Sequence, residues 1–168
     1  MKKLLGILVL GLLWCNVGFA DELFGIKLGD NVKNYDVKKI TESNTDNLKY
    51  KLFDIEPKIQ NPDFELYQIE TTLKNKIHTI RAKLKESFNS KEVCLQKMKD
   101  YVDIINNRLE QIHDVLDLDP THKWYLNKKT YQSEMHLWGL CPEYNNRYSG
   151  HILLKDFTAE KGISKEGL

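Results

Sequence analysis

Two cysteines carry the chemistry that is easiest to predict from this sequence. The chain has three cysteines, of which Cys15 lies in an N-terminal segment that we expect to be removed. Cys94 and Cys141 then form an even pair, and in an oxidising compartment such a pair most simply forms a disulfide. Closing a loop of this length stabilises a fold by about 4 kcal/mol on the chain-entropy model. Because no Cys-x-x-Cys motif is present, metal binding and a reactive thiol are the less favoured alternatives.

The histidines do not have the spacing of a metal site on a helix. They are His78, His113, His122, His136 and His151. No two of them form His-x-x-x-His, the spacing that places two ligands on one helix face. His136 and His151 are expected on neighbouring strands and could meet there, although a polar surface pair is the commoner arrangement. We therefore predict no metal site and no cofactor.

Three aspartates are close together after the predicted helix, at Asp114, Asp117 and Asp119. Calcium binds several carboxylate oxygens, so a calcium site is one interpretation. The spacing does not fit an EF-hand loop, and no glycine supplies the turn of such a loop. A solvated loop is the favoured interpretation.

Motifs for nucleophilic catalysis and phosphate binding are absent. The chain contains no Gly-x-Ser-x-Gly motif and no glycine-rich phosphate loop. We therefore predict a protein without enzymatic activity. Because catalytic groups assemble in space rather than along the chain, a hydrolase or metal-dependent enzyme with a site formed only in three dimensions is the alternative.

Aromatic residues and an arginine beside Cys141 suggest a binding surface. Tyr144, Arg147 and Tyr148 lie in one predicted loop, and these residue types dominate recognition surfaces. Four further aromatic residues are near in sequence: Trp124, Tyr125, Tyr131 and Trp138. The simpler alternative is that the tryptophans fill a core between helix and sheet and the tyrosines decorate a turn.

A hairpin and a helix are the elements that must position these residues. Residues 64–72 and 77–85 alternate as two antiparallel strands around a turn at Asn75, with a bulge in the first strand. Residues 89–112 have apolar side chains at helical spacing, with Asn89 as N-cap, Glu92 completing the capping box and Phe88 and Val93 forming a hydrophobic staple. We expect this helix to pack on the hairpin and to end within 114–120, because a helix cannot continue through Pro120.

Further strands are expected on both sides of this unit. Residues 132–141 and 151–157 predict two strands separated by a loop at 142–150. Earlier segments predict short strands at 23–29 and 50–55, a short helix capped by Asp30 or Asn31, and a polar loop at 41–47; residues 124–126 form a brief apolar patch. The fold class is α+β: a small antiparallel sheet with a β-β-α-β-β core, packed on one long amphipathic helix and stabilised by one disulfide.

The N-terminus predicts export. Lys2 and Lys3 precede an apolar run, and small residues at Gly18 and Ala20 predict a signal peptide cleaved between Ala20 and Asp21. The domains are then a signal peptide at 1–20, a single α+β domain at 21–158 and a flexible polar tail at 159–168. An N-terminal membrane anchor and acylation at Cys15 are the alternatives. No later stretch is apolar enough for a membrane helix, so we expect no stable membrane span after cleavage.

The net charge of the chain argues against one class of function, nucleic-acid binding. Removing 20 residues from 168 leaves 148, with 23 basic against 24 acidic side chains. This balance gives no support to nucleic-acid binding, which is typical of a concentrated basic excess. We expect a periplasmic or secreted, non-enzymatic module that binds an envelope protein through the exposed face of the sheet or the loop at 144–148. A small ligand is the less favoured partner. A structural protein that forms oligomers is a further alternative, and the oligomeric state is left open.

The signal segment and the opening Leu23-Phe24-Gly25-Ile26-Lys27-Leu28-Gly29 carry a resemblance. The chain resembles small, uncharacterised exported proteins of marine alphaproteobacteria, which pair a helix cysteine with a later strand cysteine. The pattern Gly25-Ile26-x-x-Gly29 is also similar to the start of small periplasmic assembly-factor and β-lactamase-inhibitor-like domains. Those domains place Ser or Thr where this chain has Asp30-Asn31, and their two helices precede the strands. Neither resemblance implies a catalytic residue.

Overall fold

The structure, a computed structural model, describes residues 22–45, 48–109, 113–119, 121–127 and 134–158. The predicted signal peptide, its cleavage point between Ala20 and Asp21, and the predicted tail at 159–168 lie outside the described residues. Within the described ranges, no helix is both long and apolar enough to cross a membrane.

Among the described residues, one helix lies on a large antiparallel sheet. The chain enters through two short strands that pair with each other, β1 (Glu22–Leu23) and β2 (Ile26–Lys27), and a 3-10 helix η1 (Val32–Asn34). The other elements are β3 (Asp36–Thr45), β4 (Leu48–Glu56), β5 (Phe64–Thr71), β6 (Ile77–Phe88), α2 (Lys91–Leu109), β7 (His113–Asp119), β8 (His122–Asn127), β9 (Glu134–Leu140), β10 (Glu143–Tyr144) and β11 (Arg147–Asp156). The fold is therefore α+β, as predicted.

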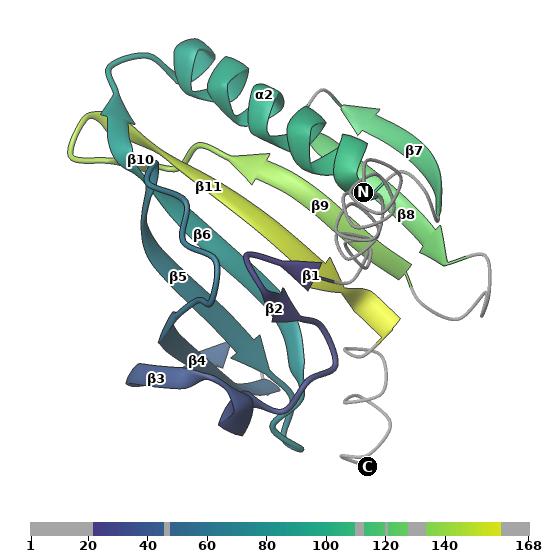
Figure 1. Cartoon of the computed structure of the whole chain (residues 1–168). Helices are drawn as coiled ribbons and strands as arrows, with labels where there is room; N and C mark the ends of the chain where they lie inside the picture. The colour runs from purple at the N-terminus through teal and green to yellow at the C-terminus, as the bar shows by residue number, and fades with distance from the viewer. Residues whose placement is uncertain (1–21, 46–47, 110–112, 120, 128–133, 159–168) are drawn as a thin grey trace, which may run out of the picture.

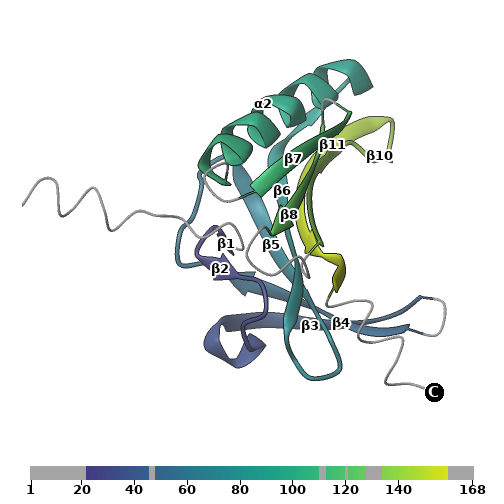
Figure 2. The same cartoon turned by 90° about the vertical axis from the view of Figure 1, so that its right-hand side faces the viewer.

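The sheet consists of two meanders joined at one seam. Its strand order is β3-β4-β5-β6-β11-β9-β8-β7, and β10 pairs with β11. Each meander connects neighbouring strands that follow one another along the chain, whereas the seam joins β6 to β11, the last strand. Helix α2 connects the two meanders and crosses one face of the sheet (Figure 1). Figure 2 shows β1 and β2 on the same side of the sheet as α2.

The predicted β5–β6 hairpin is confirmed in detail. Asn75 has a φ of 60° in the turn, and a register shift between Phe64 and Leu66 is the predicted bulge. The bulge turns Phe64 to the buried face that Tyr67 and Ile69 also occupy. The alternation in the sequence therefore predicted both strands and the buried face of β6. It placed Phe64 on the face opposite to that of Tyr67, which is wrong, because the bulge brings both to one face.

The N-cap of the helix is one residue later than predicted. Helix α2 begins at Lys91, and the Ser90 Oγ accepts a hydrogen bond from the Val93 amide at 3.4 Å. Ser90, not Asn89, is therefore the cap, and its hydroxyl also donates to Glu92 at 2.5 Å. The predicted staple is wrong as well, because Val93 is 57% exposed. The helical assignment ends at Leu109, and the predicted final residues 110–112 lie outside the described part.

Several strands occupy segments that the sequence predicted otherwise. Residues 41–45 of the predicted polar loop belong to β3, residues 114–119 of the predicted loop after the helix belong to β7, and the apolar patch at 124–126 belongs to β8. Strands β3 and β7 are the two ends of the sheet order. The tendency of a residue to form a strand depends on where the strand lies in the sheet. Polar residues are tolerated in edge strands, because an edge strand pairs on one side only and is open to solvent on the other. The predicted β-β-α-β-β core is therefore not confirmed, because β3 and β4 precede the hairpin and β7 and β8 lie between α2 and β9 along the chain.

The helix packs mainly on β11 and β9 and only marginally on the β5–β6 hairpin on which it was expected to lie. Strand β11 inserts beside β6, so the middle of the sheet under the helix is formed by the second meander. The helix buries one stripe of side chains: Cys94, Met98, Tyr101, Val102 and Ile105. They face Leu137, Ile152 and Leu154 of the two strands, which are also buried. This face of the sheet holds the core.

Candidate functional site

The predicted disulfide is present and lies beside the predicted binding residues. Cys94 and Cys141 are bonded at 2.06 Å, with their Cα atoms 6.1 Å apart. Cys94 is in the first turn of α2, and Cys141 directly follows β9. The bond therefore attaches the start of the helix to the segment that leads into β10.

Residues 142–150, predicted as a loop, form the tip of a hairpin. Strand β10 pairs with the start of β11, with Tyr144 opposite Arg147. Asn145 and Asn146 have φ values of 51° and 60°, and positive φ at both central residues is the mark of a type I′ turn. We call residues 143–148 the tip hairpin. The Asn-Asn pair is the signal in the sequence that predicts such a turn.

The tip hairpin is held in place by several polar contacts. Arg147 Nη2 donates to the Ser87 carbonyl at 2.7 Å. The Tyr148 hydroxyl donates to Glu143 at 3.3 Å, and the Glu143 carboxylate beside it raises the pKa of this tyrosine. The structure thus brings the three predicted binding residues together: Tyr144, Arg147 and Tyr148. Of these, Tyr144 is 76% exposed.

A cavity of about 520 Å³ lies between the tip hairpin and the end of β6. Its wall includes the three residues of the predicted binding surface together with side chains that sequence reasoning did not connect to them. The added polar side chains are Lys83, Lys85, Glu86 and Ser87 of β6, together with Glu143, Asn145, Ser149 and His151. The pairing of β6 with β11 brings the β6 residues beside the others.

Ser149 and His151 lie beside a register shift in β11. The register between β6 and β11 shifts between Ser149 and His151, and both residues line the cavity. The Ser149 Oγ is buried and has no hydrogen-bond partner within the described residues. Burial lowers the pKa of His151 to about 4, and the positive charges of Arg81 and Lys83 lower it further, against an opposing effect of Glu65. His151 is therefore neutral at pH 7.

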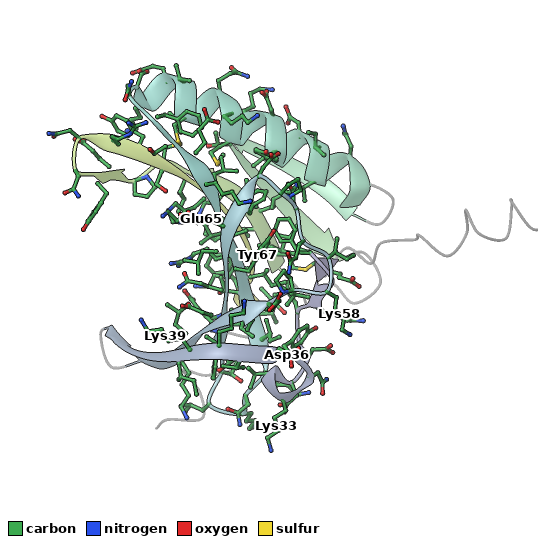
Figure 3. All side chains as sticks on the ribbon, turned by 60° about the vertical axis from the view of Figure 1, so that its left-hand side comes forward. Lys33, Asp36, Lys39, Lys58, Glu65 and Tyr67 are labelled. Carbon is green, nitrogen blue, oxygen red and sulfur yellow. A yellow bond between two sulfur atoms is a disulfide. The ribbon has the colours of Figure 1, made fainter. Side chains whose placement is uncertain are left out.

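Ion pairs continue from the cavity across the face of the sheet opposite α2. Lys83 Nζ lies 2.5 Å from Glu65, and Arg81 lies 3.0 Å from Glu70. Figure 3 shows the sheet bent so that the β11 end and the β3–β4 pair project to the same side. Glu65 lies on that side of β5, and Tyr67 lies on the other. The face that carries the cavity is thus the polar face of the sheet.

The histidines and aspartates do not assemble a metal site among the residues described. No group of three His, Cys, Asp or Glu side chains in the described part could hold an ion. The expectation that His136 and His151 could meet is wrong: His136 pairs with Lys155, four residues beyond His151, which is about 13 Å along a strand. His78 is buried, with its Nδ1 3.0 Å from the Thr79 hydroxyl.

The remaining histidines and aspartates considered as metal ligands lie on β7 and β8. The backbone places His113, Asp114, Asp117 and Asp119 on β7, and His122 on β8. The interpretation of the aspartates as part of a loop is therefore wrong, since the segment is a strand. Their side chains lie outside the described part.

Trp138 does not fill the core between helix and sheet. Its neighbours Leu137 and Gly139 face the helix, and Trp138 pairs with Leu153 on the other side. There its ring lies 6.1 Å from His136 and 6.1 Å from Phe157, centroid to centroid. The alternative that the tryptophans fill the helix–sheet core is wrong for this residue, and the side chain of Trp124 is outside the described part.

The depressed pKa of His151 predicts a pH dependence of stability. The unfolded chain binds a proton near pH 6.5, whereas the folded chain does so only near pH 4. The unfolded state therefore holds more protons between these values, and the free energy of unfolding falls as pH falls from 6.5 to 4. Urea unfolding at a series of pH values gives the free energy of unfolding of the wild type and of His151→Gln. We expect this free energy to depend less steeply on pH in the variant. Equal slopes, or an NMR titration midpoint of His151 near 6.5, would contradict this.

Comparison with protein-family models, with curated proteins and with solved structures finds no match to this chain. The functional interpretation therefore depends on the geometry of the tip hairpin and its cavity.

Proposed function

We propose that the protein is a small exported binding module without enzymatic activity, and that it binds an envelope protein through the tip hairpin and the cavity beneath it. The observation that carries this proposal is the exposure of Tyr144 beside Arg147 at the mouth of a cavity of about 520 Å³. Tyrosine and arginine are enriched among the residues that contribute most to binding at protein interfaces.

The tip hairpin is suited to binding because it is preorganised. The disulfide fixes its base, Arg147 holds it to β6, and the Ser149 amide donates to the Pro142 carbonyl at 3.0 Å. A surface that is already ordered loses less conformational entropy on association than a flexible loop does. The hairpin can therefore present its side chains to a partner at little ordering cost.

The compartment proposed is the periplasm or the extracellular space. The expected signal peptide at 1–20 and the Cys94–Cys141 bond support this, since disulfides persist in oxidising compartments. Native mass spectrometry of protein expressed with its own signal tests the proposal. We expect the mass of residues 21–168 less two hydrogens, and an uncleaved or acylated chain would overturn the proposed export.

A hydrolase is the second candidate function, because Ser149 and the neutral His151 line the same cavity. A neutral histidine brought within hydrogen-bond reach can act as the base of a serine nucleophile. Turnover of ester or amide substrates that is lost in Ser149→Ala would favour this enzyme over the binding module.

Site-specific photo-crosslinking tests the binding function. A photoreactive phenylalanine derivative at position 144 should give one discrete adduct in cells, in at least fivefold higher yield than the same group at Lys33. Lys33 is exposed in η1 and far from the tip hairpin (Figure 3). Excess unlabelled wild-type protein should suppress the adduct. Equal yields at both positions would overturn the proposal, and adducts with this chain alone would favour the structural, oligomeric alternative.

A further inference from the structure

Cationic and acidic side chains share the wall of the cavity under the tip hairpin. Three cationic side chains line it, Lys83, Lys85 and Arg147, against two acidic side chains, Glu86 and Glu143. Lys83 is paired with Glu65 of β5 at 2.5 Å, so Lys85 and Arg147 are the lining cations that remain for a ligand. The cations approach from both strands that form the cavity, β6 and β11.

Neutral hydrogen-bonding groups lie among these cations. The buried Ser149 Oγ has no partner in the described part of the chain, and a buried hydroxyl without a partner costs free energy that a ligand could recover. His151 beside it is neutral at pH 7 and can donate from one ring nitrogen. Hydroxyl and imidazole donors with surrounding cations form the set that binds an oxyanion.

We propose that this cavity binds a carboxylate of the partner, held by Lys85 and Arg147 and hydrogen-bonded by Ser149. A single carboxylate, with its charge of one, is the favoured occupant, because Glu86 and Glu143 on the same wall repel any additional negative charge. Arginine and lysine form their strongest hydrogen bonds with ionised oxygen acceptors. A doubly charged phosphate would meet the two wall acids with a greater excess of negative charge.

The volume of the cavity agrees with a ligand larger than the carboxylate alone. A cavity of about 520 Å³ lies within the range of about 300 to 1,000 Å³ that is usual for ligand pockets. The exposed ring of Tyr144 at its mouth offers an apolar surface for the chain that carries the carboxylate. Either a C-terminus or an acidic side chain of a polypeptide can supply that group.

The pKa of His151 depends on the charges around it, so it should change when a charged ligand binds in the cavity. Arg81 and Lys83 of β6 and Glu65 of β5 act on this histidine, while Lys85, Glu86, Glu143 and Arg147 complete the charged lining. A bound carboxylate adds a negative charge near His151 and stabilises its protonated form. Binding should therefore raise the pKa of His151 from its value in the free protein.

NMR titration of the isotope-labelled mature chain tests the inference at constant ionic strength. The carboxylate probes are N-acetylglycine, which represents a chain terminus, and N-acetylaspartic acid amide, which represents an acidic side chain. The neutral control is N-acetylglycinamide. We expect saturable shifts at Ser149 and His151 with at least one carboxylate probe and none with the neutral control, and the tighter probe identifies the source.

Matched variants locate the carboxylate. Lys85→Gln and Arg147→Gln should each weaken the binding of that probe at least fivefold, and Lys33→Gln, which changes the net charge equally at a remote site, should leave it unchanged. If Arg147→Gln fails to fold, Lys85→Gln decides the result. Equal binding of the neutral control, tighter binding of inorganic phosphate, or equal losses in all three variants would overturn the inference.

This inference rests on the proposed binding function but fails separately from it. A crosslinked adduct at position 144 without carboxylate binding would overturn the carboxylate site and leave the binding module. Carboxylate binding without a specific adduct would support the site and overturn the proposed protein partner.

Discussion

Replacing Cys94 and Cys141 together by alanine is expected to lower the free energy of unfolding by about 4 kcal/mol on the chain-entropy model. The bond joins residues separated by 47 positions. Without it the unfolded chain regains the conformational freedom of that loop. Cys94 is fully buried, so the smaller alanine also loses packing against the core.

Urea unfolding of the wild type and the double variant, both monitored by far-UV circular dichroism, measures this loss. The wild type under reducing conditions is the control that keeps both side chains, and it should lose most of the same free energy. Unchanged midpoints for both would contradict a stabilising role. The tip hairpin should lose its ordered structure before the rest of the fold, because the disulfide lies at its base.

Gly139→Ala is expected to cost about 3 kcal/mol of folding free energy, at the upper end of the usual cost of overpacking a core. A Cβ added at Gly139 would lie 2.5 Å from the Cβ of Met98. That atom is fixed to the helix backbone, so no change of rotamer relieves the clash. Helix α2 must move away from β9, which separates the buried side chains that pack between them.

Gly150→Ala is the matched control on the neighbouring strand. Its added Cβ would lie 2.6 Å from the Cε of Met98 and 2.8 Å from a Cδ of Leu84. Both are ends of side chains that can rotate away, so the cost should be at least about 1 kcal/mol smaller than at Gly139. Chemical unfolding of both variants makes the comparison. A larger loss at Gly150 would show that α2 adjusts more easily than the side chains do.

Local patterns in the sequence were sufficient for the hairpin, the helix and the disulfide. Alternation defined the buried face of β6 and, apart from the bulge at Phe64, that of β5. Helical spacing with a nearby cap defined α2 to within two residues at its start. The even pair of cysteines was sufficient for the bond between Cys94 and Cys141. The hairpin and the helix depend on residues close in sequence, and two cysteines can form only one disulfide.

The order of strands in the sheet could not be predicted from local patterns in the sequence. The polar residues 41–45 pair as part of β3 because an edge position tolerates them, and nothing local distinguishes them from a loop. Likewise, the helix docks on β11 and β9 because β11 inserts beside β6. The candidate site could be predicted only in part for the same reason. Aromatic and arginine composition identified Tyr144, Arg147 and Tyr148. The neighbouring Lys83 and Lys85 were missed, because they come from a strand about 60 residues earlier.

The seam between β6 and β11 has a consequence for how the chain reaches its fold. Both meanders depend on contacts between neighbouring segments, which form quickly, whereas the seam closes a long loop and is expected to form late. Until β11 arrives, β6 has an open edge beside a strongly apolar face. Open edges pair readily with other molecules. A chain terminated before Arg147 would therefore lack the strand that covers both β6 and β9, and we expect aggregation rather than a smaller stable domain.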